Sequence, residues 1–309
     1  MIYIGFDTSN YTTSVACCGG SNISLRRILN VKQGERGLRQ SDALFQHIKN
    51  MPDMFEELCR KAQSANASAV GVSIRPRNAD GSYMPVFLAG EGYARVCAAA
   101  LGVPVYNFSH QDGHIMAGIT SARADFLLYK PFISVHLSGG TCEILRTRFN
   151  GKGFDVEIVG GTKDISAGQL IDRVGVALGL KFPAGAELEK LAKKAESYCK
   201  LPINSKDGYI NFSGIETKSL SLVGVVDDAQ LSLGVFYAAG NAVAAAVRHC
   251  CHQCGIKDVL IVGGVAANGI IKRILENETD ADVYFASPEY STDNAYGVAK
   301  LTQMRYRME

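Results

Sequence analysis

One plan of elements occurs twice along the chain, and this repetition constrains the fold more than any other feature. In each half, three strand-like segments are followed by a helix, a strand, a helix and a further strand. Each copy opens with two strands joined by a polar turn, Asp7-Thr8-Ser9-Asn10 in the first half and Ser138-Gly139-Gly140-Thr141 in the second. The pattern predicts an α/β protein of two similar lobes, with a ligand cleft between them.

The length of 309 residues is sufficient for two domains. We expect an N-terminal lobe over residues 1–128 and a C-terminal lobe over residues 129–309, with a helical insertion at about residues 163–220. Ser109 is expected to cap a helix that begins near His110, and Thr292 is expected to cap a last helix that starts at Asp293. This last helix would either stay with the C-terminal lobe or pack back on the N-terminal lobe.

Charge and cysteine content restrict the class of protein. The formal net charge is only +2, so contact with a nucleic acid would depend on local patches or on partners. The nine cysteines are an odd number in a chain with a large core, which favours a reducing cytoplasm over a disulfide framework. No signal peptide is apparent, and the apolar stretch at residues 231–247 is expected to be a buried helix rather than a membrane span.

Two kinds of turn could bind a nucleotide. The two hairpin turns are rich in hydroxyls and small residues, which suits backbone contacts to phosphate, although ordinary hairpins use the same residues. The segment from Val259 to Asn268 is a buried strand that runs through Gly263-Gly264 into a helix. Its glycines would let a purine approach the backbone and Asn268 could bind a base or ribose, or Asn268 could simply cap the helix.

The sharpest local pattern is His110-Gln111-Asp112-Gly113-His114. Histidines four residues apart lie on one side of a helix, as a metal site requires, and Asp293 is a candidate third ligand. Two exposed histidines at a helix start would produce the same spacing. Because Gln111 stands where a zinc protease needs glutamate, an endopeptidase is the least favoured function.

A second group of metal-binding residue types is His249-Cys250-Cys251-His252-Gln253-Cys254. These residues lie around the end of an apolar helix and lack a second ligand pair, so they favour core packing over a metal site. The acidic residues Asp164, Asp172 and Glu189 read as solvated helix charges when taken alone.

Several segments, in order along most of the chain, resemble the TsaD family of tRNA threonylcarbamoyladenosine transferases. That family belongs to the actin-like and sugar-kinase-like (ASKHA) superfamily, so the resemblance implies two RNase H-like lobes with a nucleotide cleft between them. The match is best from Val103 onward. The resembling segments are His110-Gln111-Asp112-Gly113-His114, Leu137-Ser138-Gly139-Gly140-Thr141, Ser166 to Arg173, Phe182 to Glu189, Asn211 to Ile215, Gly263 to Asn268 and Thr292-Asp293-Asn294.

The resemblance implies the roles of particular residues. His110, His114 and Asp293 would bind one metal ion, iron or zinc with magnesium as a further option. The phosphate of threonylcarbamoyl-adenylate, or of another adenine nucleotide, would be held by His136, Leu137, Ser138, Gly139 and Gly140. The remainder of that ligand would contact Asp172, Gly185, Glu189 and Asn268. The metal would polarise the acyl group for attack by the adenosine amine of tRNA. No catalytic side chain is assigned.

The chain departs from the family pattern mainly in its first lobe. The first turn continues with Asn10-Tyr11-Thr12-Thr13 instead of acidic residues, and residues 33–46 lack the family's Gly-Gly-Val-Val-Pro-Glu segment. The family's glycine-rich stretch is replaced by residues 74–83, which carry Arg75 and Arg77. In the second lobe, Glu216 stands where the family tends to have lysine. These departures are typical of a divergent paralogue.

Three functions follow from these observations. The leading one is metal-dependent transfer of a threonylcarbamoyl group to tRNA, with TsaB-like and TsaE-like proteins as potential partners. A second is a carbamoyltransferase, or another nucleotide-using enzyme of the same fold, that acts on a small molecule. A third is a non-catalytic paralogue that binds an active relative, in a homodimer or heterodimer. None of the three involves a membrane.

Overall fold

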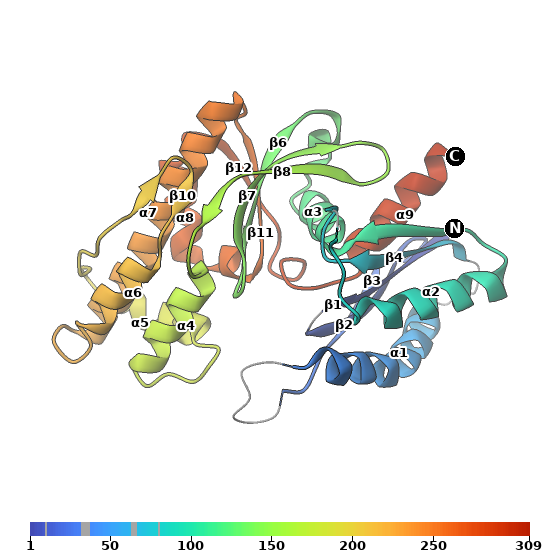
Figure 1. The fold of residues 1–309 in the computed structure, drawn as a ribbon, viewed down its shortest axis with the longest axis horizontal. Coiled ribbons are helices and arrows are strands. Elements are labelled where there is room, and N and C mark those ends of the chain that lie inside the picture. Colours follow the sequence, from blue (N-terminus) through green and yellow to red (C-terminus); the bar gives the residue numbers. More distant parts are fainter. Residues whose placement is uncertain (10, 32–37, 63–66, 80) are drawn as a thin grey trace. The chain divides into compact units, whose positions relative to one another are not determined.

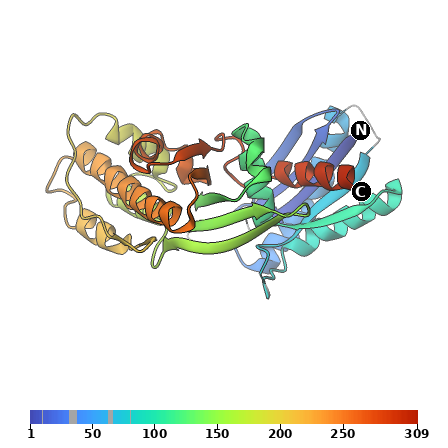
Figure 2. The same cartoon turned by 90° about the horizontal axis from the view of Figure 1, so that it is seen from above.

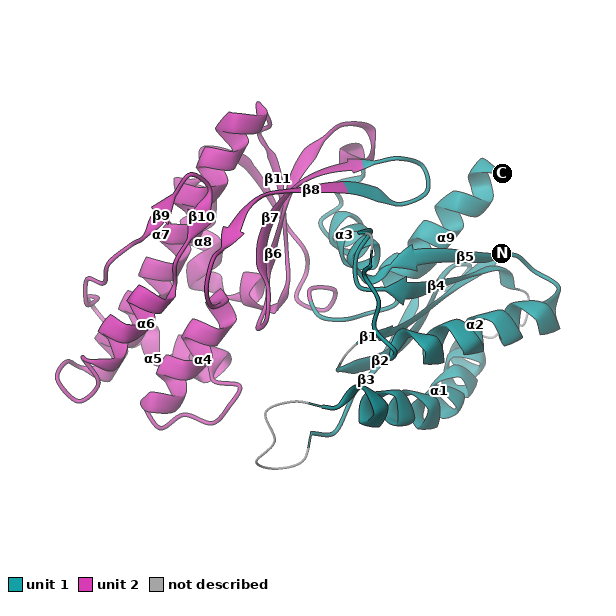
Figure 3. Cartoon of the chain, viewed as in Figure 1, with its two compact units in different colours: residues 1–125, 149–155, 292–309 teal, residues 126–148, 156–291 magenta. Residues whose placement is uncertain are grey.

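A computed structural model describes residues 1–309 except 10, 32–37, 63–66 and 80. The described chain forms two compact units (Figure 3). Unit 1 comprises residues 1–125, 149–155 and 292–309, and unit 2 comprises residues 126–148 and 156–291. Asn10 of the first expected turn and residues 33–37 of the departing segment lie outside the described residues.

Unit 1 is built on a five-stranded sheet in the order β3-β2-β1-β4-β5 (Figure 1). The first three strands form an antiparallel meander, β4 pairs with β1 in parallel, and β5 pairs with β4 in parallel. The strands are β1 (Ile2–Ser9), β2 (Thr12–Gly19), β3 (Ile23–Ile28), β4 (Ala67–Arg75) and β5 (Val105–Ser109).

The prediction of a turn at Asp7-Thr8-Ser9-Asn10 is wrong for its first three residues. Asp7, Thr8 and Ser9 continue β1, which pairs with β2 as far as Ser9↔Thr12. All three side chains are buried. Sequence reasoning took polar residues as a sign of a turn, whereas here they are the buried end of a strand. Their polar atoms therefore need partners inside the unit rather than water.

Helices cover both faces of this sheet. The helices α1 (Gln40–Ala62) and α2 (Phe87–Leu101) pack on the face that carries Ile2, Ile4 and Phe6. Side chains alternate along a strand, so Tyr3, Gly5 and Asp7 project from the other face. That face is covered by α9 (Tyr296–Met308), and a Cβ on Gly5 would come within 2.5 Å of the backbone oxygen of Ala295.

The helix α3 (His110–Ser121) lies against α9, as Figure 2 shows. The two helices cross so closely that a Cβ on Gly297 would overlap the backbone oxygen of Gly113. Glycine at this crossing permits a backbone-to-backbone approach that any side chain would prevent. The crossing fixes the start of α3 next to the segment that precedes α9.

Unit 2 contains a seven-stranded sheet in the order β12-β11-β6-β7-β8-β10-β9. The strands β6, β11 and β12 run parallel, so their carboxyl ends meet at one edge of the sheet. The strands are β6 (Phe132–Leu137), β7 (Cys142–Phe149), β8 (Phe154–Thr162), β9 (Ser205–Lys206), β10 (Tyr209–Ile210), β11 (Asp258–Val262) and β12 (Asp282–Phe285).

The core of unit 2 surrounds the long helix α7 (Asp228–Cys254), which contacts the shorter helices and β6. The shorter helices are α4 (Ala167–Ala177), α5 (Gly185–Ala192), α6 (Ser213–Leu220) and α8 (Gly269–Glu278). Short 3₁₀ turns occur at η1 (Asp125–Tyr129) and η2 (Gly264–Ala267). By length and composition α7 could cross a membrane, but 72% of its most apolar window is buried in the structure, as in a core helix.

The crossing at Gly113 and Gly297 yields a stability prediction. Gly297→Ala should destabilise unit 1, because overpacking costs about 1–3 kcal/mol while the better helix propensity of alanine returns at most about 1 kcal/mol. Gly92→Ala in α2 is the matched control, since its Cβ would meet no atom within 4 Å. We expect a lower midpoint of urea unfolding for Gly297→Ala and an unchanged or higher one for Gly92→Ala. Equal midpoints would contradict the proposed tight crossing.

Candidate metal centre and nucleotide site

The start of α3 is held by a reciprocal cap. The Ser109 hydroxyl accepts a hydrogen bond from the Asp112 backbone N–H at 3.0 Å, and the Asp112 carboxylate accepts from the Ser109 N–H at 2.9 Å. This capping box satisfies two backbone donors that a helix start would leave unpaired. The expected cap at Ser109 is therefore present, and it makes His110 the first residue of α3.

Asp112 also ties two loops of unit 1 to α3. Its oxygens accept hydrogen bonds from the Asn78 amide and from the Phe154 backbone N–H, all at 2.9 Å. Asn78 in turn accepts from the Arg75 guanidinium at 3.1 Å. The carboxylate, which is 2% exposed, has the partners that a buried charge needs. The middle of the two-histidine motif is thus structural.

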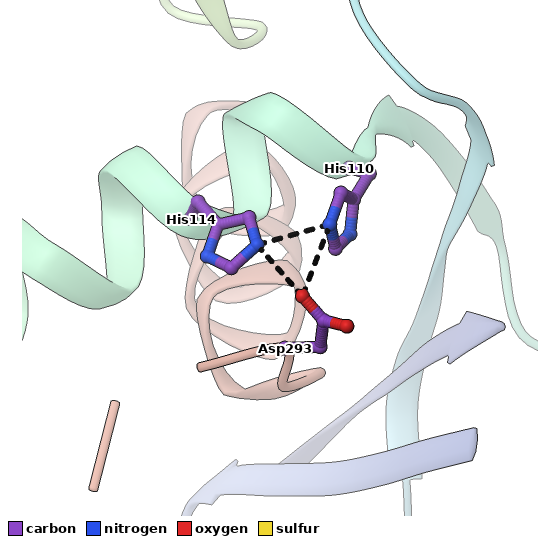
Figure 4. Close-up of side chains that lie close together, drawn as sticks. All are labelled: His110, His114 and Asp293. Carbon is purple, nitrogen blue, oxygen red and sulfur yellow. Dashed lines mark hydrogen bonds and ion pairs between the residues drawn. The ribbon is translucent and has the colours of Figure 1, made fainter. Parts of the chain in front are cut away.

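His110, His114 and Asp293 converge within unit 1 (Figure 4). The Nε2 atoms of the two histidines are 2.9 Å apart, and Oδ1 of Asp293 lies 3.3 Å from Nε2 of His114 and 3.6 Å from Nε2 of His110. The histidines share one side of α3 because they are one turn apart. Asp293 differs from expectation in one respect: α9 begins at Tyr296, so Asp293 lies in the preceding loop.

Two carboxylates, those of Asp7 and Asp293, lie beside the His110 ring and favour a positive charge there. Desolvation lowers the pKa of His110, but the carboxylates of Asp7 and Asp293 outweigh it and raise this pKa to about 10. Desolvation raises the pKa of Asp293, but hydrogen bonds and charge from both histidines hold it well below its usual range. Without a metal, a proton on His110 therefore supplies the positive charge. Two imidazoles and one carboxylate form a donor set that suits a transition metal ion.

In unit 2 the turn at Ser138–Thr141 follows β6, as expected. The Ser138 hydroxyl accepts from the backbone N–H of Thr141 at 3.0 Å, and the Ser166 hydroxyl donates to the Gly139 carbonyl at 2.7 Å. A Cβ on Gly168 would come within 2.5 Å of Gly139 Cα, so the turn lies tightly against the start of α4. Added Cβ atoms on Gly139 and Gly140 would meet nothing within 4 Å. The turn is thus tightly packed on one side and open on the other.

The Gly263-Gly264 turn lies beside the Ser138–Thr141 turn. Val262 pairs with His136 in the parallel ladder, and a Cβ on Gly263 would overlap the Leu137 carbonyl. Gly264 has open space around it. Ligands of α/β proteins commonly bind at the carboxyl ends of parallel strands, which is where both turns stand.

The remaining nucleotide candidates lie on α4, α5 and α8. Asp172 accepts a hydrogen bond from the Ala184 backbone N–H at 2.8 Å, and burial raises its pKa. Glu189 accepts from the Gly269 N–H at 3.1 Å and from Lys193 at 2.7 Å.

The side-chain oxygen of Asn268 caps α8 through the N–H groups of Ile270 and Ile271. The capping role of Asn268 is therefore present, and a ligand would be bound through the remaining amide group. Gly185 is the first residue of α5, and a Cβ on it would stand 3.7 Å from the Ile171 side chain.

The cysteine-rich end of α7 does not form a comparable cluster. Among the described residues, the only group of three or more metal-binding side chains is His110, His114 and Asp293. Cys250 is buried and donates to the Val159 carbonyl at 3.4 Å, and burial raises its pKa to about 11. Cys250 and Cys251 are buried in the core of unit 2, and Cys254 is half-buried.

Comparison with solved structures identifies the class of fold. The crystal structure of T. kodakarensis HypF matches with a TM-score of 0.62 and 14% identity over 99% of this chain and 47% of that one. A ROK family glucokinase from Streptomyces griseus, solved with glucose and AMPPNP, matches with a TM-score of 0.55 and 12% identity over 98% and 99% of the two chains. The chain thus shares its α/β fold with these proteins, which is the fold that the resemblance to the TsaD family implied.

Comparison of sequences identifies the family. The TsaD family model, described as tRNA N6-adenosine threonylcarbamoyltransferase, matches residues 24–300. A protein of that name from Thermus thermophilus is 28% identical over 99% of this chain and 94% of its own length. One from Shouchella clausii is 30% identical over 81% and 75%. The chain belongs to the TsaD family and is a transferase.

The charge balance of the triad predicts that metal binding releases protons. Because the pKa of His110 is about 10, a divalent ion added near pH 7 must displace the proton from its imidazole. Binding should therefore weaken about tenfold for each pH unit of acidification, as long as one proton is displaced. Calorimetry with Zn²⁺ in buffers of different ionisation enthalpy measures the released protons.

The double variant His110→Ala/His114→Ala is the control for this measurement. It should lose both the bound metal and the proton release. Unchanged metal content in this variant would place the ion elsewhere, with residues 250–254 as the next region to test.

Proposed function

We propose that this chain transfers a threonylcarbamoyl group from threonylcarbamoyl-adenylate to adenosine of tRNA and that a metal ion held by the triad takes part. The observation that carries the proposal is the convergence of His110, His114 and Asp293 in a member of the TsaD family. Imidazole ligands favour iron or zinc over magnesium, which prefers oxygen ligands. When bound, such an ion would neutralise phosphate charge and polarise the acyl group.

The residues of unit 2 would bind the adenylate. Backbone N–H groups of the open turn at Ser138, Gly139 and Gly140 are suited to the phosphate, with His136 and Leu137 leading into it. The adenosine would lie over Gly263-Gly264 and contact Asn268. Asp172, Gly185 and Glu189 would contact the rest of the ligand, and their backbone hydrogen bonds keep both carboxylates in place.

The second candidate function is that of a nucleotide-using transferase with a small-molecule acceptor. It is favoured by the net charge of +2, which provides little long-range attraction for a polyanion such as tRNA. The departures from the family in unit 1 point the same way. The assembled triad favours both enzymatic functions over a non-catalytic paralogue, because a scaffold has no need of a metal site.

Partners and location follow from the leading proposal. The acceptor is tRNA, and TsaB-like and TsaE-like proteins would supply surface that the chain lacks. The cytoplasm, where tRNA occurs, is the proposed location. The chain would act as a homodimer or as a heterodimer with a relative.

The central test is a transfer assay with threonylcarbamoyl-adenylate and unmodified tRNA. We expect little product from the chain alone and clear product with partner proteins, since the chain has a weak electrostatic field of its own. The loop that carries Arg75 and Arg77 is held beside α3 by a hydrogen bond from the Gln111 N–H to the Pro76 carbonyl at 3.0 Å. If these arginines bind the acceptor, Arg75→Ala/Arg77→Ala should reduce transfer and leave nucleotide affinity unchanged. Arg60→Ala, at the exposed end of α1, is the control.

One outcome of this assay would contradict the role given to the arginine loop, and another would contradict tRNA as the acceptor. Transfer to tRNA by the chain alone, unaffected by both arginine changes, would contradict the acceptor role of the loop. No transfer under any condition, with nucleotide and metal still bound, would favour the small-molecule acceptor.

The nucleotide contact has its own test at Gly264. Because an added Cβ there meets nothing within 4 Å, Gly264→Val should fold normally. If adenine packs on this backbone, the valine should weaken AMP or ATP binding about 5- to 150-fold, the affinity equivalent of a steric cost of about 1–3 kcal/mol. Gly214→Val in α6, which also has open space, should leave affinity unchanged. Equal affinity of the Gly264 variant and the wild type would assign this turn a purely structural role.

A further inference from the structure

A buried carboxylate contacts Nδ1 of His110, the ring nitrogen that faces away from His114 and Asp293. Oδ1 of Asp7 lies 3.0 Å from Nδ1 of His110, and the Asp7 side chain is 0% exposed. The other ring nitrogen, Nε2, faces Asp293 and His114. One imidazole is therefore shared between a buried acid on its Nδ1 side and the candidate ligands on its Nε2 side.

The position of Asp7 is set by β1. Asp7 pairs with Ser14 on β2, and its neighbour Phe6 points into the core under α1 and α2. Strand alternation turns Asp7 to the opposite face, where Gly5 lets α9 approach the sheet. The Ser14 hydroxyl donates to the Asp7 backbone carbonyl at 3.2 Å, which holds the main chain but leaves the carboxylate for His110.

A buried carboxylate is costly unless it has a specific partner. Desolvation of an unpaired ion costs several kcal/mol, and hydrogen bonding to a cationic or N–H donor offsets this cost. An ionised carboxylate can only accept a hydrogen bond, so a donor is required at Nδ1 of His110. With the proton on Nδ1, the lone pair of the neutral ring is on Nε2.

We infer that Asp7 is a positioning residue for the metal centre, which selects the His110 tautomer whose Nε2 can bind the ion. Carboxylate–histidine–metal arrangements of this kind orient the ring and raise its basicity. The inference rests on the proposed metal centre, and it assigns a function to a residue that sequence reasoning had placed in a phosphate turn. Asp7 touches neither nucleotide nor acceptor in this role, because it acts through His110.

The first experiment uses the wild-type protein and Zn²⁺ as the probe. Long-range ¹H–¹⁵N NMR of the zinc-loaded protein reports which ring nitrogen of each histidine carries a proton. We expect the His110 signals to show a protonated Nδ1 and a metal-bound Nε2. A zinc-loaded protein in which His110 lacks the Nδ1 proton, or binds zinc through Nδ1, would overturn the inference.

The second experiment measures zinc affinity in Asp7→Asn. An amide at this position can donate to Nδ1 and so favour the wrong tautomer, and we expect the affinity to fall about 10- to 100-fold. Ser14→Ala is the matched control, because Ser14 contacts Asp7 only through the main chain. Wild-type affinity in a folded Asp7→Asn variant would remove the positioning role.

These results separate failure of the inference from failure of the proposed metal centre. A wild-type protein that binds no zinc at the triad removes the metal centre, and with it the role of Asp7. A wild-type protein that binds zinc while Asp7→Asn binds equally well removes the role of Asp7 alone. If Asp7→Asn does not fold, the NMR result on the wild type decides.

Discussion

The close crossing of α3 and α9 is the contact on which the candidate metal centre depends. Gly113 stands between the two histidines of the motif, and Gly297 stands four residues after Asp293. Because neither residue carries a side chain at the point of contact, the two backbones meet directly. The distance between the imidazoles and the carboxylate is thus set by main-chain packing. A site positioned by backbone contact needs few further interactions to stay within the short range that a metal ion requires.

Around this crossing, each acidic residue has a distinct task. Asp112 holds the helix start and two loops by accepting hydrogen bonds, while Asp293 faces the histidines directly. Asp7 faces the far side of the His110 ring. Acids that look alike in sequence therefore divide into a structural residue, a candidate ligand and a proposed positioning residue. The division follows from which donor each carboxylate meets, since burial makes an unpaired carboxylate costly.

Sequence reasoning could predict what depends on local spacing. The cap at Ser109, the shared face of His110 and His114 and the turn at Ser138–Thr141 all follow from helix periodicity and turn chemistry. It could not predict that Asp7 is buried in β1, because strand ends and turns use the same polar residues. It also could not predict the contact between Gly113 and Gly297, since residues so far apart in sequence leave no local pattern. The lobe boundaries at residues 128 and 129 and the ligand roles stay predictions.

Most departures from the family pattern lie in the first lobe, and their places indicate which part of the reaction this chain could have altered. Residues 11–13 and 74–83 differ from the family, yet the loop at 75–78 is still tied to Asp112 through Asn78. A change of acceptor would require new side chains at the surface of such a loop and leave its buried anchor alone. In unit 2, the Ser138–Thr141 turn and the Gly263-Gly264 turn keep their adjoining places at the ends of β6 and β11. A chain that kept a nucleotide-activated acyl donor and altered its acceptor would show this distribution, because donor chemistry depends on backbone geometry and acceptor choice on exposed side chains.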